Sequence, residues 1–394
     1  MSASTPLSAE CRLVFRSADP SCAPAELAAL ANAVQDWERA VFIAEREMAT
    51  SNLWRGLRDS AAALPVGVAE HLKKSAMVSD FRMQHLSQRL QGTARVLAER
   101  GIPFLLLKGA AVGAIMDPTF RSRPMSDIDL LVHREDTARA RDAVIASGWP
   151  QTSDAVLIEL LKDAHHLPHF VDPQLAGVRL ELHVELMPED NSFAFGEAEL
   201  WADAHPASEP FTGALVPSRE HLLLHVCVHF AWQHTMSFGA WRTFRAVSAM
   251  AATQAFDWER FVRGARAAKA ATSCYWTLRL SARLAGIVIP TDVLERLAPP
   301  TPEWVQRALE RHFVAGIALG EAQASPSEQL TRLLWRAALR PKWSGHRAPG
   351  RYDPDRRWEH AHGLASTETF PERVARHLSG YRDWWRFFTH TLLR

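Results

Sequence analysis

Residues 105–133 read LLLKGAAVGAIMDPTFRSRPMSDIDLLVH and contain two apolar runs with charged residues at their ends. The first run closes with Lys108 and Gly109, and the second opens with Asp127 and Asp129. Short apolar runs bounded by Gly or Pro are typical of buried strands. Residues two apart in a strand share a face, so the two aspartates project side by side. Neighbouring carboxylates repel unless a cation or water lies between them, so this pair suggests a cation site.

The sequence around this stretch predicts a small α/β unit. AAVGAIM (110–116) favours a helix, and DPTFRSRPMS (117–126) is typical of a loop because it contains two prolines. REDTARARDAVIASG (134–148) is amphipathic, with acids early and glycine last, and predicts a second helix. GVRLELHVEL (177–186) alternates polar and apolar residues and predicts a third strand.

Glu181 supplies a third carboxylate on that third strand. The alternation places it on one face with Arg179, His183 and Glu185, opposite the leucines. Three carboxylates on adjacent strands would form a site for Mg²⁺ or Mn²⁺, which prefer oxygen ligands. His183 shares the face of Glu181 and is therefore expected to bind a carboxylate or the substrate.

Basic and small residues next to the acids predict a phosphate site. Lys108 and Gly109 close a strand before a helix, where glycine allows close approach and the helix N-terminus favours anions. Arg121, Arg123 and Ser126 lie on the loop that leads into the acidic strand, so their donors are expected to hold phosphate oxygens beside the ion.

The rest of the chain predicts an α+β protein in four parts. Residues 1–23 are expected to be a mobile tail, and residues 24–100 have helical periodicity. Residues 101–212 form the expected core, and residues 213–394 are again helical, with a long basic loop near 340–366. Within this last part, Ser218 is expected to cap a helix.

Composition indicates a soluble cytoplasmic protein. The formal net charge of +1 gives no indication of a nucleic-acid or a membrane partner. The four cysteines form no CxxC pair, which fits a reducing compartment. The N-terminal sequence lacks the pattern of a signal peptide. No apolar stretch approaches the ~20 residues needed to cross a bilayer.

The linked motifs LKG, R, DIDLLV and RLELHVEL resemble the uncharacterised nucleotidyltransferase family of the DNA polymerase beta superfamily. The resemblance covers about residues 95–260 and implies a small mixed-sheet nucleotidyltransferase core between two helical regions. It implies that Asp127 and Asp129 bind the catalytic ions and that Glu181 is the third carboxylate. It also implies an NTP as co-substrate, with the turn at Gly109 against its phosphates.

Two positions depart from the pattern of that family. Ala110 follows Gly109 where the superfamily has Ser or Gly, so no side-chain hydroxyl is available at the turn. Val184 follows ELH where the family has an aromatic residue. The first departure leaves open an inactive nucleotide- or partner-binding module on the same fold.

The leading hypothesis is transfer of a nucleoside monophosphate to a small-molecule or peptide acceptor. Family members are associated with peptide natural-product biosynthesis. The C-terminal helices, with Trp232, Trp241 and nearby histidines, would form the acceptor side. Another reading is a toxin- or antitoxin-type enzyme acting on RNA or protein, although the near-neutral charge argues against a bulk RNA substrate.

Several histidines lie outside these motifs. One set shares a helix face within residues 221–234, and another lies in DAHHLPHF; they are His221, His225, His229, His165, His166 and His169. The helical set lacks an HExxH pattern, so we interpret both sets as structural or pocket residues in preference to metal ligands. The basic stretch 340–357 is interpreted as a solvated loop.

Overall fold

The computed structural model describes residues 7–151, 165–187, 193–234, 236, 238–251 and 256–319. The chain divides into two units. One spans Pro6–Pro188 and Phe193–Pro299 and contains the sheet. In the other unit, the described element is helix α15 (Glu303–Leu319). The basic loop expected near 340–366 lies outside the described residues.

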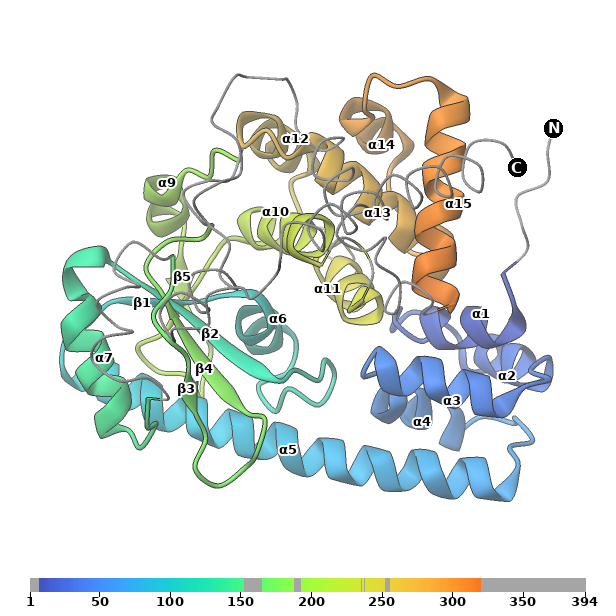
Figure 1. Cartoon of the computed structure of the whole chain (residues 1–394), viewed down its shortest axis with the longest axis horizontal. Coiled ribbons are helices and arrows are strands. Elements are labelled where there is room, and N and C mark those ends of the chain that lie inside the picture. The colour runs from blue at the N-terminus through green and yellow to red at the C-terminus, as the bar shows by residue number, and fades with distance from the viewer. Residues whose placement is uncertain are drawn as a thin grey trace, which may run out of the picture. The chain divides into compact units, whose positions relative to one another are not determined.

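The first unit contains a mixed sheet in the strand order β3-β4-β2-β1-β6-β5, which lies toward the left in Figure 1. β1 pairs antiparallel with β2, whereas β2 pairs in parallel with β4 and β1 with β6. The strands are β1 (Phe104–Leu106), β2 (Asp127–Val132), β3 (Phe170–Val171), β4 (Arg179–His183), β5 (His205–Pro206) and β6 (Leu215–Val216). The predicted α+β class with a mixed sheet is confirmed.

β4 ends earlier than its sequence pattern indicates. The alternation continues to residue 186, but the strand stops at His183. The amides of Val184 and Glu185 both donate to the carbonyl of His165, at 2.8 and 3.1 Å, so the regular ladder cannot continue. Glu185 then pairs with Arg134 and not with the acids of the sheet.

Helices contact the sheet and each other within the same unit. α6 (Lys108–Met116) follows β1 directly, and α7 (Thr137–Ala146) follows β2 through a 3₁₀ turn, η1 (Arg134–Asp136). α5 (Val66–Glu99) is one continuous helix of 34 residues that contacts α7 and α4. It runs along the lower edge of Figure 1, from the sheet to the N-terminal helices.

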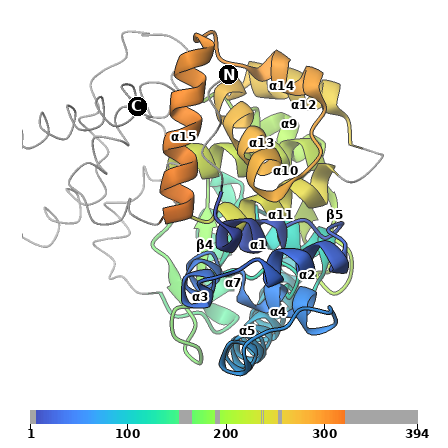
Figure 2. The ribbon, with the colours of Figure 1, turned by 90° about the vertical axis from the view of Figure 1, so that its right-hand side faces the viewer.

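The N-terminal segment contains a helix where the sequence predicted a mobile tail. α1 (Ala9–Arg16) buries Leu13, Val14 and Phe15, and the Ser8 hydroxyl accepts a hydrogen bond from the amide of Cys11. α1 is too short to be stable as an isolated helix. It contacts α13, so burial against a helix distant in the sequence stabilises it. α2 (Pro24–Asn32), α3 (Trp37–Arg46) and α4 (Thr50–Arg58) follow, and Figure 2 shows α3 and α4 beside α5.

The C-terminal part of the first unit consists of helices, most of which contact α13. They are α9 (Glu197–Ala202), α10 (Arg219–Val228), the π-helical turn η2 (His229–Gln233), α11 (Ala240–Ala251), α12 (Trp258–Ala267), α13 (Ala271–Ala285) and α14 (Thr291–Leu297). Ser218 caps α10 by accepting from the amide of His221, as predicted. None of the described helices is both long and apolar enough to span a bilayer.

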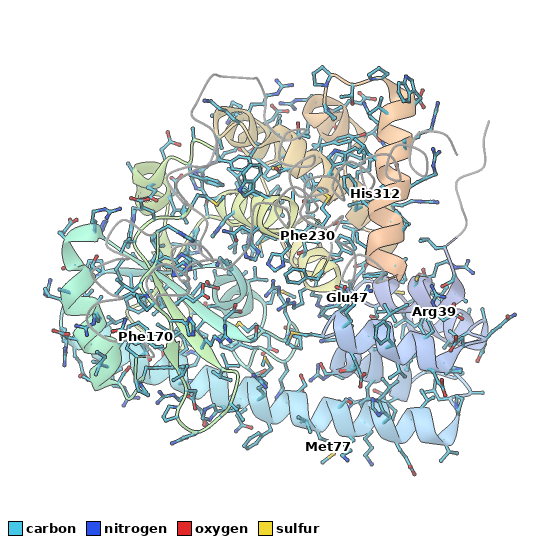
Figure 3. All side chains as sticks on the ribbon, viewed as in Figure 1. Arg39, Glu47, Met77, Phe170, Phe230 and His312 are labelled. Atoms are coloured by element: carbon cyan, nitrogen blue, oxygen red, sulfur yellow. The ribbon has the colours of Figure 1, made fainter. Side chains whose placement is uncertain are left out.

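Trp241 is a core residue. It was expected on the acceptor side of the site, but its side chain is fully buried. Its indole Nε1 donates to the Ser17 hydroxyl at 3.0 Å, and its amide donates to Glu47 at 3.1 Å. Glu47 is labelled in Figure 3. Trp241 therefore joins α11 to the N-terminal helices.

α5 also carries an exposed apolar row. Val66, Met77, Val78 and Phe81 are all more than half exposed, and Figure 3 shows Met77 on the outer side of this helix. Isolated exposed apolar residues are common on protein surfaces, so this row carries no functional conclusion by itself.

Gly113 allows α6 to approach the loop that follows it. A Cβ at Gly113 would lie 2.2 Å from Cδ1 of Phe120, which is fully buried and stacks on Phe211 with ring centroids 5.4 Å apart. We expect Gly113→Ala to lower the free energy of unfolding by about 1–3 kcal/mol, because the buried ring has no room to move. Urea denaturation measures this change. Gly92→Ala on α5, where nothing lies within 4 Å, is the control and should be neutral or stabilising.

Candidate active site

The strand register brings two of the predicted acids together. In the parallel pair β2–β4, Asp129 is the register partner of Glu181. Adjacent strands lie about 4.8 Å apart and register partners project to the same face, so these carboxylates are neighbours. Asp127 lies on the same face two residues earlier, opposite Arg179.

Two basic side chains contact this acidic pair. The Nζ of Lys108 lies 2.7 Å from Asp129 Oδ1 and 3.9 Å from Glu181 Oε2. The Nε2 of His183 lies 2.9 Å from the same Asp129 oxygen and 3.5 Å from the same Glu181 oxygen. Asp129 is 2% exposed and Glu181 23%, so Glu181 is the carboxylate that solvent reaches.

The three acids differ in their electrostatics. Burial opposes ionisation of Asp129, but Lys108 and His183 hold its pKa well below the usual value. Burial likewise opposes ionisation of Glu181, yet the hydrogen bond from His183 leaves its pKa lowered. At Asp127, burial raises the pKa and the charge of Asp129 raises it further. Negative charge is therefore only partly neutralised on this face of the sheet.

A divalent cation fits these residues. Asp129, Glu181 and His183 each offer one ligand atom, and these atoms lie within 4.8 Å of one another. Carboxylate oxygens suit Mg²⁺ and Mn²⁺, and imidazole is a common ligand of transition metals. Among the described residues, this set does not include Asp127. Asp127 lies on the same face of the sheet, where burial and the charge of Asp129 raise its pKa.

Positive charge gathers where α6 begins. A Cβ at Gly109 would lie 2.9 Å from Nη1 of Arg123 and 3.0 Å from Sδ of Met125, so only glycine lets this guanidinium approach the first turn of α6. Arg123 is 8% exposed, and its Nε donates to the carbonyl of Arg242 at 3.1 Å. Burial, together with the charge of Arg242, lowers the pKa of Arg123 to about 9. A buried guanidinium beside a helix N-terminus favours an anion.

The other predicted loop residues are placed differently. The Ser126 hydroxyl lies 3.4 Å from Asp127 Oδ1, so it is next to the acids. The Arg121 side chain is exposed, and its carbonyl accepts from Arg55 at 2.8 Å. Asp117 fixes the loop by accepting from the amides of Thr119 and Ser122.

Two histidines from DAHHLPHF lie against His183. Residues 165–171 run along β4, and the ring centroids of His165 and His166 lie 5.6 and 5.4 Å from that of His183. Burial, with the charges of neighbouring histidines and Lys108, lowers the pKa of His165 to about 2. This imidazole is therefore neutral near pH 7.

Helix α10 and the turn η2 that follows it contribute two further histidines near the acids, His225 and His229. Burial, together with the charge of Lys108, lowers the pKa of His225 to about 3. The same causes hold the pKa of His229 well below its usual value. In the described part of the chain, Nδ1 of His165, Nδ1 of His183 and Nε2 of His225 are buried without a hydrogen-bond partner. Buried polar atoms without a partner are uncommon in folded proteins and cluster here around the acids.

Sequence reasoning interpreted these histidines as structural or pocket residues, with those near Trp232 on the acceptor side, but did not place them beside Asp129. The i, i+4 spacing of His225 and His229 indicated that they share one helix face. No local sequence feature indicated that this face lies near Asp129. Arg242 lies 119 residues after Arg123, and no sequence motif connects the two.

Comparison with known families finds that residues 33–286 match the family described as "Uncharacterised nucleotidyltransferase". The chain belongs to this family. The match contains β1, α6, β2 and β4, which carry the acids and Lys108. Neither the comparison with curated proteins nor that with solved structures found a match. The protein is thus an enzyme of the nucleotidyltransferase class, and its family implies an NTP substrate.

Proposed function

We propose that this nucleotidyltransferase moves a nucleoside monophosphate from an NTP to an acceptor, using Mg²⁺ or Mn²⁺ held by Asp127, Asp129 and Glu181. The register pairing of Asp129 with Glu181 is the observation that carries the proposal. His183 is a further candidate ligand. When bound, such an ion neutralises triphosphate charge and favours ionisation of an attacking hydroxyl.

The start of α6 is the proposed triphosphate site. Arg123 and the amides of the first helical turn would bind phosphate oxygens, and Gly109 leaves space for this guanidinium. Lys108 and Ser126 flank the acids and would bind the oxygens nearest to them. Arg242 adds a positive charge that the sequence did not indicate.

The acceptor would approach Glu181, the more exposed of the two paired carboxylates. Glu181 Oε2 is proposed to take the proton of an acceptor hydroxyl or amine, with His183 holding this carboxylate in place at 3.5 Å. We propose a small molecule or peptide as acceptor. Arg121 is exposed and would contact it from outside. The four cysteines all lie within the described residues, are buried and form no disulfide there, which supports the proposed cytoplasmic location.

Glu181→Gln tests this function. The purified protein is mixed with Mg²⁺, each α-labelled NTP in turn, and cell extract as the source of acceptor. We expect label transfer and pyrophosphate release with one or more NTPs. The variant should be slower by about 10²–10⁴-fold, the usual contribution of a positioned proton acceptor.

Glu185→Gln is the matched control, because Glu185 follows β4 but pairs with Arg134. It should keep wild-type activity. Transfer that proceeds at full rate in Glu181→Gln, or without any divalent ion, would contradict the proposal.

A further inference from the structure

Lys108 has a backbone conformation that lysine rarely adopts. Its φ of 42° lies in the left-handed region. The amide of Leu107 donates to the carbonyl of Asp129 at 3.0 Å, and α6 begins at Lys108, so strand and helix hold this residue from both sides. Glycine would adopt the same φ without strain, so Lys108 stands at a position whose backbone favours glycine.

The ammonium of Lys108 lies among the candidate metal ligands. The side chain is 13% exposed, and Nζ contacts Asp129 Oδ1 at 2.7 Å and Glu181 Oε2 at 3.9 Å. His183 Nε2 approaches the same two oxygens. The lysine is therefore a cation on the oxygens that a metal ion would use.

We propose that Lys108 is a built-in counter-cation, which neutralises Asp129 and Glu181 in the metal-free protein and moves off these oxygens when a divalent ion binds there. This inference rests on the proposed function, since it concerns the ion site of that reaction.

Simultaneous occupation is electrostatically unfavourable. Mg²⁺ takes carboxylate oxygens at about 2.0–2.1 Å. The ammonium already lies 2.7 Å from Asp129 Oδ1, so the two cations would be only a few ångströms apart. Repulsion between charges at such a distance is strong in a buried site. The lysine side chain, in contrast, has a flexible stem and reaches other partners without backbone movement.

The triphosphate is the next partner for the displaced ammonium. Lys108 is the first residue of α6, and the N-terminus of a helix favours anions. The phosphate oxygens of an NTP bound there would pair with the ammonium of Lys108 when the divalent ion replaces it on the carboxylates. Nucleotide and ion should therefore favour each other's binding, by the reciprocity of linked equilibria.

Binding of Mn²⁺ alone, without nucleotide, tests the exchange. Free Mn²⁺ is measured by electron paramagnetic resonance during titration of the full chain. Lys108→Gln removes the competing charge and should bind Mn²⁺ about tenfold more tightly than wild type, or better. Lys108→Arg keeps the charge and should show no such gain. Lys74→Gln, at an exposed position on α5, is the control and should bind as wild type does.

The outcomes separate this inference from the proposed function. If Asp129→Asn abolishes Mn²⁺ binding but Lys108→Gln binds no more tightly than wild type, the exchange is overturned and the ion site stands. If no protein binds Mn²⁺, the ion site itself is overturned. If Lys108→Gln is unfolded without the ion, Mn²⁺ should restore its circular dichroism, and failure to do so overturns the exchange.

Discussion

Replacing Asp129 by asparagine is expected to slow nucleotidyl transfer by about 10³-fold or more. Asp129 Oδ1 binds both Lys108 and His183, and it belongs to the ligand set with Glu181. The amide has no negative charge, so it weakens ion binding and disturbs the arrangement of both basic side chains. Loss of several kcal/mol of transition-state charge stabilisation corresponds to at least this factor.

The measurement is the initial rate of label transfer from the preferred NTP, compared at saturating Mg²⁺. Circular dichroism shows whether the variant is folded. Asp142→Asn on α7 is the control, because this carboxylate is 65% exposed. It should keep the wild-type rate. If the Asp129→Asn protein is folded and retains most of the wild-type rate of transfer, Asp129 is not a catalytic residue.

Stability is expected to fall as the pH drops below about 6.5, and His225→Gln should reduce that fall. Burial lowers the pKa of His225 to about 3, whereas the imidazole of an unfolded chain titrates near 6.5. Between these values the unfolded state binds more protons. The stabilisation is therefore complete above pH 6.5 and is lost as the pH falls toward 3, by about 1.4 kcal/mol per pH unit.

Urea denaturation at pH 6.5 and pH 5 measures this effect. The variant should lose about 2 kcal/mol less than wild type over that interval, since one fewer buried imidazole titrates. His71→Gln is the control, because His71 is 46% exposed and pairs with Glu45 at the surface. It should retain the wild-type pH dependence. An equal slope in His225→Gln would mean that His225 does not oppose protonation in the folded protein.

The sequence predicted the elements that carry the acids because their signals are local. The apolar runs before Lys108 and after Asp127 correspond to β1 and β2. The alternating residues around Glu181 correspond to β4. The segment AAVGAIM lies in α6, which begins two residues earlier, at Lys108. Each pattern reports burial on one or both faces of an element, which is a property of that element alone.

The remaining features depend on contacts between distant segments. β3, β5 and β6 have two residues each, too few to show an alternation. α1 is stabilised by contact with α13, and β4 stops where the carbonyl of His165 takes two amides. The ion pair of Lys108 with Asp129 requires the antiparallel pairing of β1 with β2. The approach of His225 to this pair requires the packing of α10 on α6. Neither contact can be predicted from the periodicity of the sequence around the residues that make it.

The pairing of β2 with β4 in the interior of the sheet has a consequence for how substrate preference can change. The spacing of Asp129 and Glu181 is set by backbone hydrogen bonds between two inner strands, which tolerate little displacement. His225 belongs to α10, a helix that contacts α6. Substitutions that tilt α10 would therefore reshape the rim around the acids without altering their separation, so selectivity and reactivity are independently adjustable in this scaffold.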